Sequence, residues 1–216
     1  MNNLRQAGLL PLLALSFTTQ AAEADFFKDS TATLQARNYY FSRDFSDIVG
    51  ANQQSKAEEW GQGFIFNYKS GYTPGVVGIG VDAIGLLGLK LDSSPDRTGT
   101  GLLPVQDDGR AADEYSRLGA TLKLRYSKTE LKVGELQTNL PILQYNDSRL
   151  LPPTYQGVSI TSAEISGLTL QAGHLSSTSL RNEAGDEKLI AMLGHLPQRQ
   201  AESDAFNFVG GDYSFN

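Results

Sequence analysis

The feature that most constrains the fold is the stretch GVVGIGVDAIGLLGLKLD at residues 75–92. Alternate residues from Val77 to Leu91 are apolar or glycine, whereas the residues between them include three glycines, a carboxylate and a lysine. Successive side chains of a strand point to opposite sides, so this alternation predicts a β-strand with two unlike faces. A strand of this length suits a tilted membrane crossing. We therefore expect one face to contact lipid and the other to face a channel.

Period-two alternation recurs along the chain, and helical periodicity is weak. The connections alternate between short turns and long segments, the latter at 42–57, 92–113, 138–154 and 179–204. Short turns on one side and long loops on the other are typical of transmembrane β-barrels of the outer membrane. The pattern predicts an all-β protein, an antiparallel up-and-down barrel whose eight strands lie at residues 29–41, 58–71, 76–91, 114–127, 129–137, 155–165, 168–178 and 205–215.

Two of these strands show the expected sorting of side chains. The even residues of the second strand carry most of its aromatic side chains, at Trp60, Phe64, Phe66, Tyr68 and Tyr72. Aromatic side chains at the ends of an apolar band are typical of the membrane interface. The fourth strand has leucines on its even positions and three cations on its odd ones, which require water on that side: Arg117, Lys123 and Arg125. A soluble sheet with a solvated outer face is the alternative.

The N-terminus has the three parts of a secretory signal peptide. Arg5 precedes an apolar run from Ala7 to Phe17, and small residues follow with possible cleavage after Ala21 or Ala24. We expect a signal peptide at 1–24 and a barrel portion at 25–216, although a buried N-terminal helix is the alternative. The net charge of −6 gives nucleic acid no electrostatic support as a partner.

The chain offers little for catalysis. It has no cysteine and two histidines, His174 and His195, and neither lies in a nucleophile motif. The acidic segment 106–114 lacks the spacing of a calcium loop. We expect no enzyme activity, no metal and no cofactor.

A channel gives the charged side chains a use, since cations along a water-filled wall attract anionic solutes. A planar guanidinium can bind both oxygens of a carboxylate. Candidate wall residues are Thr33, Gln35, Arg37, Tyr39, Arg117, Lys123 and Arg125, with Asp82 as a carboxylate among them.

The long segment 138–154 has an apolar run, three prolines and an arginine, which is unusual for a loop in water. We expect it to fold inward and narrow the channel, with Tyr145, Asp147 and Arg149 near the solute. Ile84 and Leu86 do not suit an aqueous wall, and an inward loop packed on them would explain both. The glycines at 78, 80 and 88 would leave room for water or for that loop. An ordinary outer loop is the alternative.

Several long motifs resemble the OprD family of outer-membrane porins: RNYYFSRDF (37–45), EWGQGFI (59–65), SGYTPGVVGIGVDAIGLLGLKLDSS (70–94), TGTGLLPVQDDGRAADEYSRLG (98–119), SKTELKVGE (127–135), SRLLPPTYQG (148–157) and GLTLQAGHL (167–175). The resemblance implies an 18-stranded barrel, a homotrimer, a third long loop folded into the channel, and passage of small solutes that carry a carboxylate. It also places a wall arginine at Arg43.

Members of this family are roughly twice as long, so we expect this chain to be the N-terminal half of a porin, with about eight strands forming an open or incomplete barrel. Its partners would be lipid of the outer membrane of a Gram-negative bacterium and aromatic or aliphatic acids or amino acids. Two alternatives remain: a small structural or adhesive outer-membrane barrel without a transport role, and a secreted β-sandwich that binds a ligand.

Overall fold

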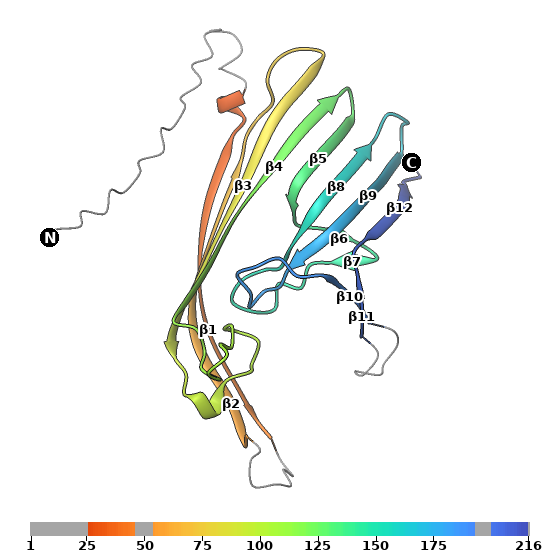
Figure 1. Ribbon diagram of the computed structural model, residues 1–216. Helices are drawn as coiled ribbons and strands as arrows, with labels where there is room; N and C mark the ends of the chain where they lie inside the picture. Colours follow the sequence, from red (N-terminus) through yellow and green to blue (C-terminus); the bar gives the residue numbers. More distant parts are fainter. Residues whose placement is uncertain (1–25, 46–53, 193–199, 216) are drawn as a thin grey trace, which may run out of the picture.

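The computed structural model describes residues 26–45, 54–192 and 200–215. Eight strands form one antiparallel sheet in the order β1-β2-β3-β4-β5-β8-β9-β12 (Figure 1). The predicted all-β, antiparallel up-and-down arrangement is confirmed. The strands are β1 (Thr31–Asp44), β2 (Lys56–Lys69), β3 (Val77–Asp92), β4 (Glu114–Tyr126), β5 (Thr129–Leu136), β8 (Thr154–Ser162), β9 (Leu168–Ser179) and β12 (Phe206–Tyr213).

All eight strands begin and end within three residues of the predicted bounds. The prediction lacked the short elements inside the long connections, which are η1 (Pro95–Arg97), β6 (Asn139–Leu140), β7 (Leu143–Gln144), β10 (Leu189–Met192) and β11 (Gln200–Ser203). No helix in the described ranges is long and apolar enough to cross a membrane. The signal peptide expected at 1–24 lies outside the described residues.

The sheet has an outer and an inner face, and β3 shows the difference. Its odd residues are partly or largely exposed, with Val77 50% and Ile79 46% accessible. Its even residues, among them Ile84 and Leu86, are mostly buried on the inner face. Paired residues of β3 and β4 lie on the same face of the sheet. Leu118 of β4, which is 84% exposed, therefore lies beside Gly85 on the outer face. The outer face is therefore apolar without any protein layer covering it in the described part of the chain.

The main hydrophobic core lies on the inner face. Ile65, Ile84 and Leu86 of the sheet pack there against Leu102 and Leu103 of the β3–β4 connection. Leu150 and Leu151 of the β5–β8 connection complete the cluster, and both are fully buried. Burial of one leucine side chain contributes about 1.5–3 kcal/mol, so these contacts fix both connections on the sheet. The two apolar residues on the inner face of β3 are thus covered by chain.

Glycine is needed at three positions of β3 for a reason that differs from the predicted one. A Cβ on Gly88 would lie 2.1 Å from the ring of Tyr115, and one on Gly80 would lie 2.7 Å from the Gly71 carbonyl oxygen. At Gly78 a Cβ would lie 3.0 Å from Cβ of Tyr72. The prediction that these glycines leave room for water or an inward loop is wrong. They allow neighbouring strand and turn residues to approach the backbone.

The sheet is open. β1 and β12 stand at opposite ends of the strand order, and within the described residues they do not pair with each other. Pairing of these two strands would define the small closed barrel considered above. Figure 1 shows the sheet curving, with the β3–β4 and β5–β8 connections toward one end and the short turns at the other. We call these ends the loop end and the turn end.

Candidate solute pathway

The connection at residues 137–153, here called the inward segment, is fixed to β1 at the loop end. Arg37 donates to both carboxylate oxygens of Asp147, at 2.7 and 3.0 Å, and to the Arg149 carbonyl oxygen at 2.7 Å. The Tyr39 hydroxyl donates to the Ser148 carbonyl oxygen at 3.2 Å. A planar guanidinium matches the two oxygens of a carboxylate, so Arg37 fixes the position of the segment as well as its charge.

Arg149 lies on the inner face next to β1. Its guanidinium carbon is 4.5 Å from the centre of the Phe41 ring, and that of Arg43 is 5.6 Å from the same ring. Arg149 also donates to the carbonyl oxygens of Thr100, at 3.3 Å, and of Ser148, at 2.9 Å. A cation stacked on an aromatic face keeps its charge while its orientation is fixed.

Arg181, in the connection after β9, was not predicted as a site residue. It donates to the Ser148 hydroxyl oxygen at 3.4 Å, and Arg149 reaches the same oxygen at 3.3 Å. Burial lowers the pKa of the Arg181 guanidinium, and the charge of Arg149 lowers it further. The sequence signal was an isolated arginine in a long loop, which by itself points to no partner.

Lys123 is the most buried cation of β4, and a carboxylate inside the protein compensates its charge. Its ammonium lies 2.6 Å from the Asp82 carboxylate and donates to the Ser70 carbonyl oxygen at 2.9 Å. On the next strand, Lys132 pairs in the same way with Glu130 at 2.8 Å. These pairs leave little free charge at their positions on the wall.

Arg125 is exposed at the turn end, and it lies over the ring of Tyr72 with 4.1 Å between the guanidinium carbon and the ring centre. Tyr72 donates to Glu130. Burial, followed by this hydrogen bond, raises the pKa of Tyr72. The prediction of Tyr72 as an outward aromatic residue is therefore wrong, because β2 ends at Lys69 and the alternation does not continue into the turn.

Arg117 is on the inner face, as its alternation predicts, but it binds backbone. It donates to the carbonyl oxygens of Leu180, at 2.9 Å, and Pro152, at 2.8 Å. Both acceptors belong to long connections, so Arg117 ties the end of the inward segment to the loop that carries Arg181. Glu59, fully buried on β2, has a comparable role because it accepts a hydrogen bond from the Thr100 hydroxyl.

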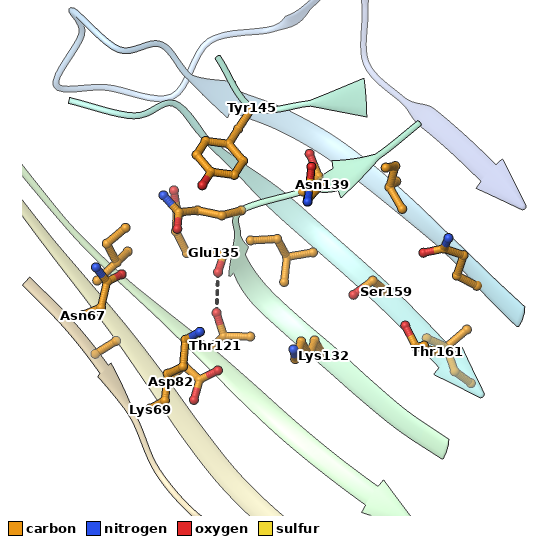
Figure 2. A pocket seen from close by; sticks show the side chains of 18 of the residues that line it. Asn67, Lys69, Asp82, Thr121, Lys132, Glu135, Asn139, Tyr145, Ser159 and Thr161 are labelled. Carbon is orange, nitrogen blue, oxygen red and sulfur yellow. Dashed lines mark hydrogen bonds between the residues drawn. The ribbon is translucent and has the colours of Figure 1, made fainter. Parts of the chain in front are cut away.

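A hollow of about 430 Å³ opens beside the inward segment (Figure 2). Tyr145 lies above Glu135 in this view, and Asp82 and Lys69 lie on the opposite side. Side chains that can donate or accept hydrogen bonds form much of the lining, including Asn67, Thr121, Lys132, Asn139, Ser159, Thr161 and Gln171. The hollow can hold a small polar solute in contact with both sheet and segment.

The structure places every predicted pathway residue on the inner face or on the inward segment. Arg37, Asp147 and Arg149 come together at the loop end, whereas Asp82, Lys123 and Arg125 lie toward the turn end. Of the two histidines, His174 is exposed on β9 and contacts Asn207 at 2.8 Å, and His195 lies outside the described residues. The described ranges contain no group of three or more His, Cys, Asp or Glu residues that could hold a metal ion.

An up-and-down antiparallel sheet, apolar outside and charged inside, with short turns at one end and an inward segment at the other, defines the wall of a porin-type β-barrel. Residues 24–216 match a protein family described as outer membrane porin, OprD family. The chain is 49% identical over 204 residues to the porin-like protein GalP of Pseudomonas putida, an alignment that covers 94% of this chain and 48% of that protein. The chain therefore belongs to the OprD family of outer-membrane porins.

Solved structures agree with this assignment. OccK9 (OpdG) of Pseudomonas aeruginosa aligns with a TM-score of 0.81 and 53% identity, over 88% of this chain and 48% of that one. OpdK of Pseudomonas aeruginosa, solved with vanillate, aligns with a TM-score of 0.77 and 47% identity, over 88% and 47% of the two chains. The chain spans about half the length of the relatives it matches. Those relatives are channels of the outer membrane.

Proposed function

We propose that this chain forms part of the wall of a channel that passes small solutes carrying a carboxylate across the outer membrane. The observation that carries the proposal is a group of inner-face guanidiniums without a carboxylate partner in the described chain. Arg43, Arg125 and Arg149 form no salt bridge there, and two of them are held on aromatic rings at the loop end. Cations fixed along a water-filled wall attract anions and favour their passage.

The location of the free charge supports the proposal further. The chain as a whole carries a net charge of −6, yet these guanidiniums lie on the inner face, Arg43 and Arg149 beside the inward segment and Arg125 at the turn end. Lys123, Lys132 and Arg37 are paired with carboxylates, so the remaining cations set the local potential. Vanillate, present in the OpdK structure, is an aromatic carboxylate, which is consistent with solutes of this class.

Closure of the channel requires strands beyond the eight described. In the described residues β1 and β12 each have one edge without a partner strand, and an exposed edge is a site for further pairing. We propose that further strands of the same type complete the barrel, and that the finished barrel assembles as a trimer. Chemical cross-linking in outer membranes, followed by electrophoresis of unheated samples, tests the trimer.

The channel is tested with the complete product of the gene, purified in detergent and reconstituted in planar bilayers. We expect a small conductance whose reversal potential in a salt gradient indicates a preference for anions. Replacing Arg43, Arg125 and Arg149 with glutamine together should shift that potential toward cation preference. Lys128→Gln, an exposed cation in the β4–β5 turn, is the matched control and should leave the preference unchanged. Absence of a channel, or an anion preference insensitive to the triple replacement, contradicts the proposal.

A further inference from the structure

The β2–β3 turn, residues 70–76, brings the side chain of Tyr72 onto the inner face at the turn end. The backbone N–H groups of Ser70 and Thr73, on either side of Tyr72, donate to carbonyl oxygens of β3 at 3.1 and 2.9 Å. The turn also lies close above the strand, since a Cβ on Gly78 would be 3.0 Å from Cβ of Tyr72. The turn therefore holds one aromatic side chain against the charged residues of β4 and β5.

The Tyr72 hydroxyl occupies a carboxylate that lies across from an arginine. Arg125 of β4 is directly paired with Glu130 of β5, and side chains opposite each other on neighbouring strands are close enough to interact. These opposite charges nevertheless form no salt bridge in the part of the chain that the structure describes. Glu130 instead accepts from the Tyr72 hydroxyl and lies 2.8 Å from the Lys132 ammonium. The nearest cross-strand counter-charge of Arg125 is thus engaged elsewhere.

The Tyr72 ring holds the guanidinium of Arg125. The guanidinium carbon lies 4.1 Å from the ring centre, and the Lys123 ammonium lies 4.9 Å from the same centre. Lys123 is compensated by Asp82 at 2.6 Å, whereas Arg125 is exposed and has no carboxylate partner among the described residues. A cation over an aromatic face is attracted by the ring and remains charged. Arg125 therefore keeps an uncompensated charge in a fixed place on the inner face.

We infer that Tyr72 is a positioning residue of the channel mouth at the turn end. Its hydroxyl occupies Glu130 and its ring orients Arg125, so that the arginine keeps its charge in the solute path. The inference rests on the proposed channel function and adds a residue that acts only through its neighbours. Without the hydroxyl, Glu130 has an oxygen available for Arg125, and a salt bridge between the two cancels the charge.

A charge fixed at one end of a channel makes the current differ between the two voltage polarities. The test therefore uses the complete gene product in planar bilayers, with the same potassium chloride solution on both sides, and measures the ratio of currents at equal and opposite voltages. The chain has no cysteine, so Ile165→Cys, 60% exposed in the β8–β9 turn, reports the insertion direction through an impermeant maleimide added to one chamber. Each recording comes from a protein that has folded and inserted.

Removal of the arginine sets the size of the effect. A unit charge about 5 Å from the solute path, partly screened at about 0.1 M salt, changes the local anion concentration about twofold. We expect Arg125→Gln to change the current ratio by about the same factor. The change should shrink at about 1 M salt, where screening is stronger.

Tyr72→Phe removes the hydroxyl, keeps the ring and so isolates the contact with Glu130. We expect this variant to change the current ratio about as much as Arg125→Gln does, because a salt bridge between Glu130 and Arg125 cancels the same charge. The effect requires both partners, so Tyr72→Phe should add nothing to Arg125→Gln or to Glu130→Gln. Lys128→Gln, an exposed cation in the β4–β5 turn, is the matched control and should leave the ratio unchanged.

Several results would overturn the inference. An unchanged ratio in Arg125→Gln or Tyr72→Phe means that the hydroxyl does not keep an effective charge free. An effect of Tyr72→Phe that persists in the Arg125→Gln background means that Tyr72 acts by another route. An equal change in Lys128→Gln means that any charge at the turn end has this effect.

The proposed channel function fails in a different way. Absence of a channel, or of a preference for anions, refutes that function itself. An anion-preferring channel whose current ratio is insensitive to Tyr72→Phe refutes only the role of Tyr72.

Discussion

The contact between Arg37 and Asp147 should control how firmly the inward segment is held. Asp147→Asn removes the charge but keeps one acceptor oxygen in the same place. The wild-type pair has two hydrogen bonds, and Arg37 and Asp147 are 16% and 40% exposed. This burial lies between that of a surface pair, worth about 0.2–1 kcal/mol, and that of a buried charge-assisted contact, worth about 1.5–3 kcal/mol. We expect a loss of about 1.5 kcal/mol, which raises the population of displaced segment about tenfold.

The chain has no cysteine, so a single introduced thiol reports displacement without background. Leu150 of the inward segment is fully buried against the sheet, and Leu150→Cys reacts with a maleimide only when the segment leaves the sheet. Added Asp147→Asn or Arg37→Gln should each raise the labelling rate about tenfold over Leu150→Cys alone. The open-channel current noise of the same variants, without the cysteine, should rise in parallel.

The double variant distinguishes a pair from two independent contacts. If Arg37 acts mainly through Asp147, the second replacement adds little and the labelling rate stays near tenfold. A rate near a hundredfold means that the two side chains act separately. An unchanged rate in the single variants means that the leucine contacts hold the segment alone, and either result refutes the reasoning.

Three further predictions concern the sheet and its turns. Lys123→Met leaves a partly buried carboxylate without its cation and should lower the free energy of unfolding by about 3 kcal/mol in a denaturant titration. Gly88→Ala, whose Cβ would lie 2.1 Å from the Tyr115 ring, should reduce the yield of folded protein, whereas Gly85→Ala, with 3.6 Å to the nearest atom, should be tolerated. Backbone and hydroxyl donors lower the pKa of the Glu164 carboxyl group, which lies in the β8–β9 turn. The wild-type protein should therefore be more stable than Glu164→Gln at pH 7, and this difference in stability should disappear as the pH falls through the lowered pKa. Denaturation midpoints of both proteins at pH 7 and pH 3 test this.

The strands could be predicted because one face of each strand is selected for apolar contact and the other for water or packing. Alternation in β3 and β4 identified the face on which Asp82, Lys123 and Arg125 lie. It also indicated that Ile84 and Leu86 needed cover, and Leu150 of the inward segment supplies part of it. Alternation is a property of strand geometry, so it is readable without tertiary information.

Contacts between distant segments could not be predicted in the same way. Nothing local shows that Arg181 reaches Ser148, or that Arg117 bonds to backbone when Arg125 on the same face does not. The glycines of β3 were misread for the same reason, since the need for glycine at position 88 comes from Tyr115 on the neighbouring strand. Residue type shows which interactions a side chain can form, but contacts in the fold determine which charges and hydrogen-bond donors remain without a partner.

The wall cations differ in whether a carboxylate partner compensates their charge, and we expect this difference to decide whether each affects stability or selectivity more. Lys123, with 6% exposure and a carboxylate at 2.6 Å, contributes little field to a passing solute. Arg149 and Arg181 both donate to one hydroxyl and have no carboxylate partner in the described chain, so in the proposed channel we expect their charge to act on the solute. Replacing Lys123 should therefore affect stability more than selectivity, and replacing Arg149 should do the reverse. Parallel denaturation and reversal-potential measurements on Lys123→Met and Arg149→Gln test this ranking, and a selectivity change of equal size in both variants would contradict it.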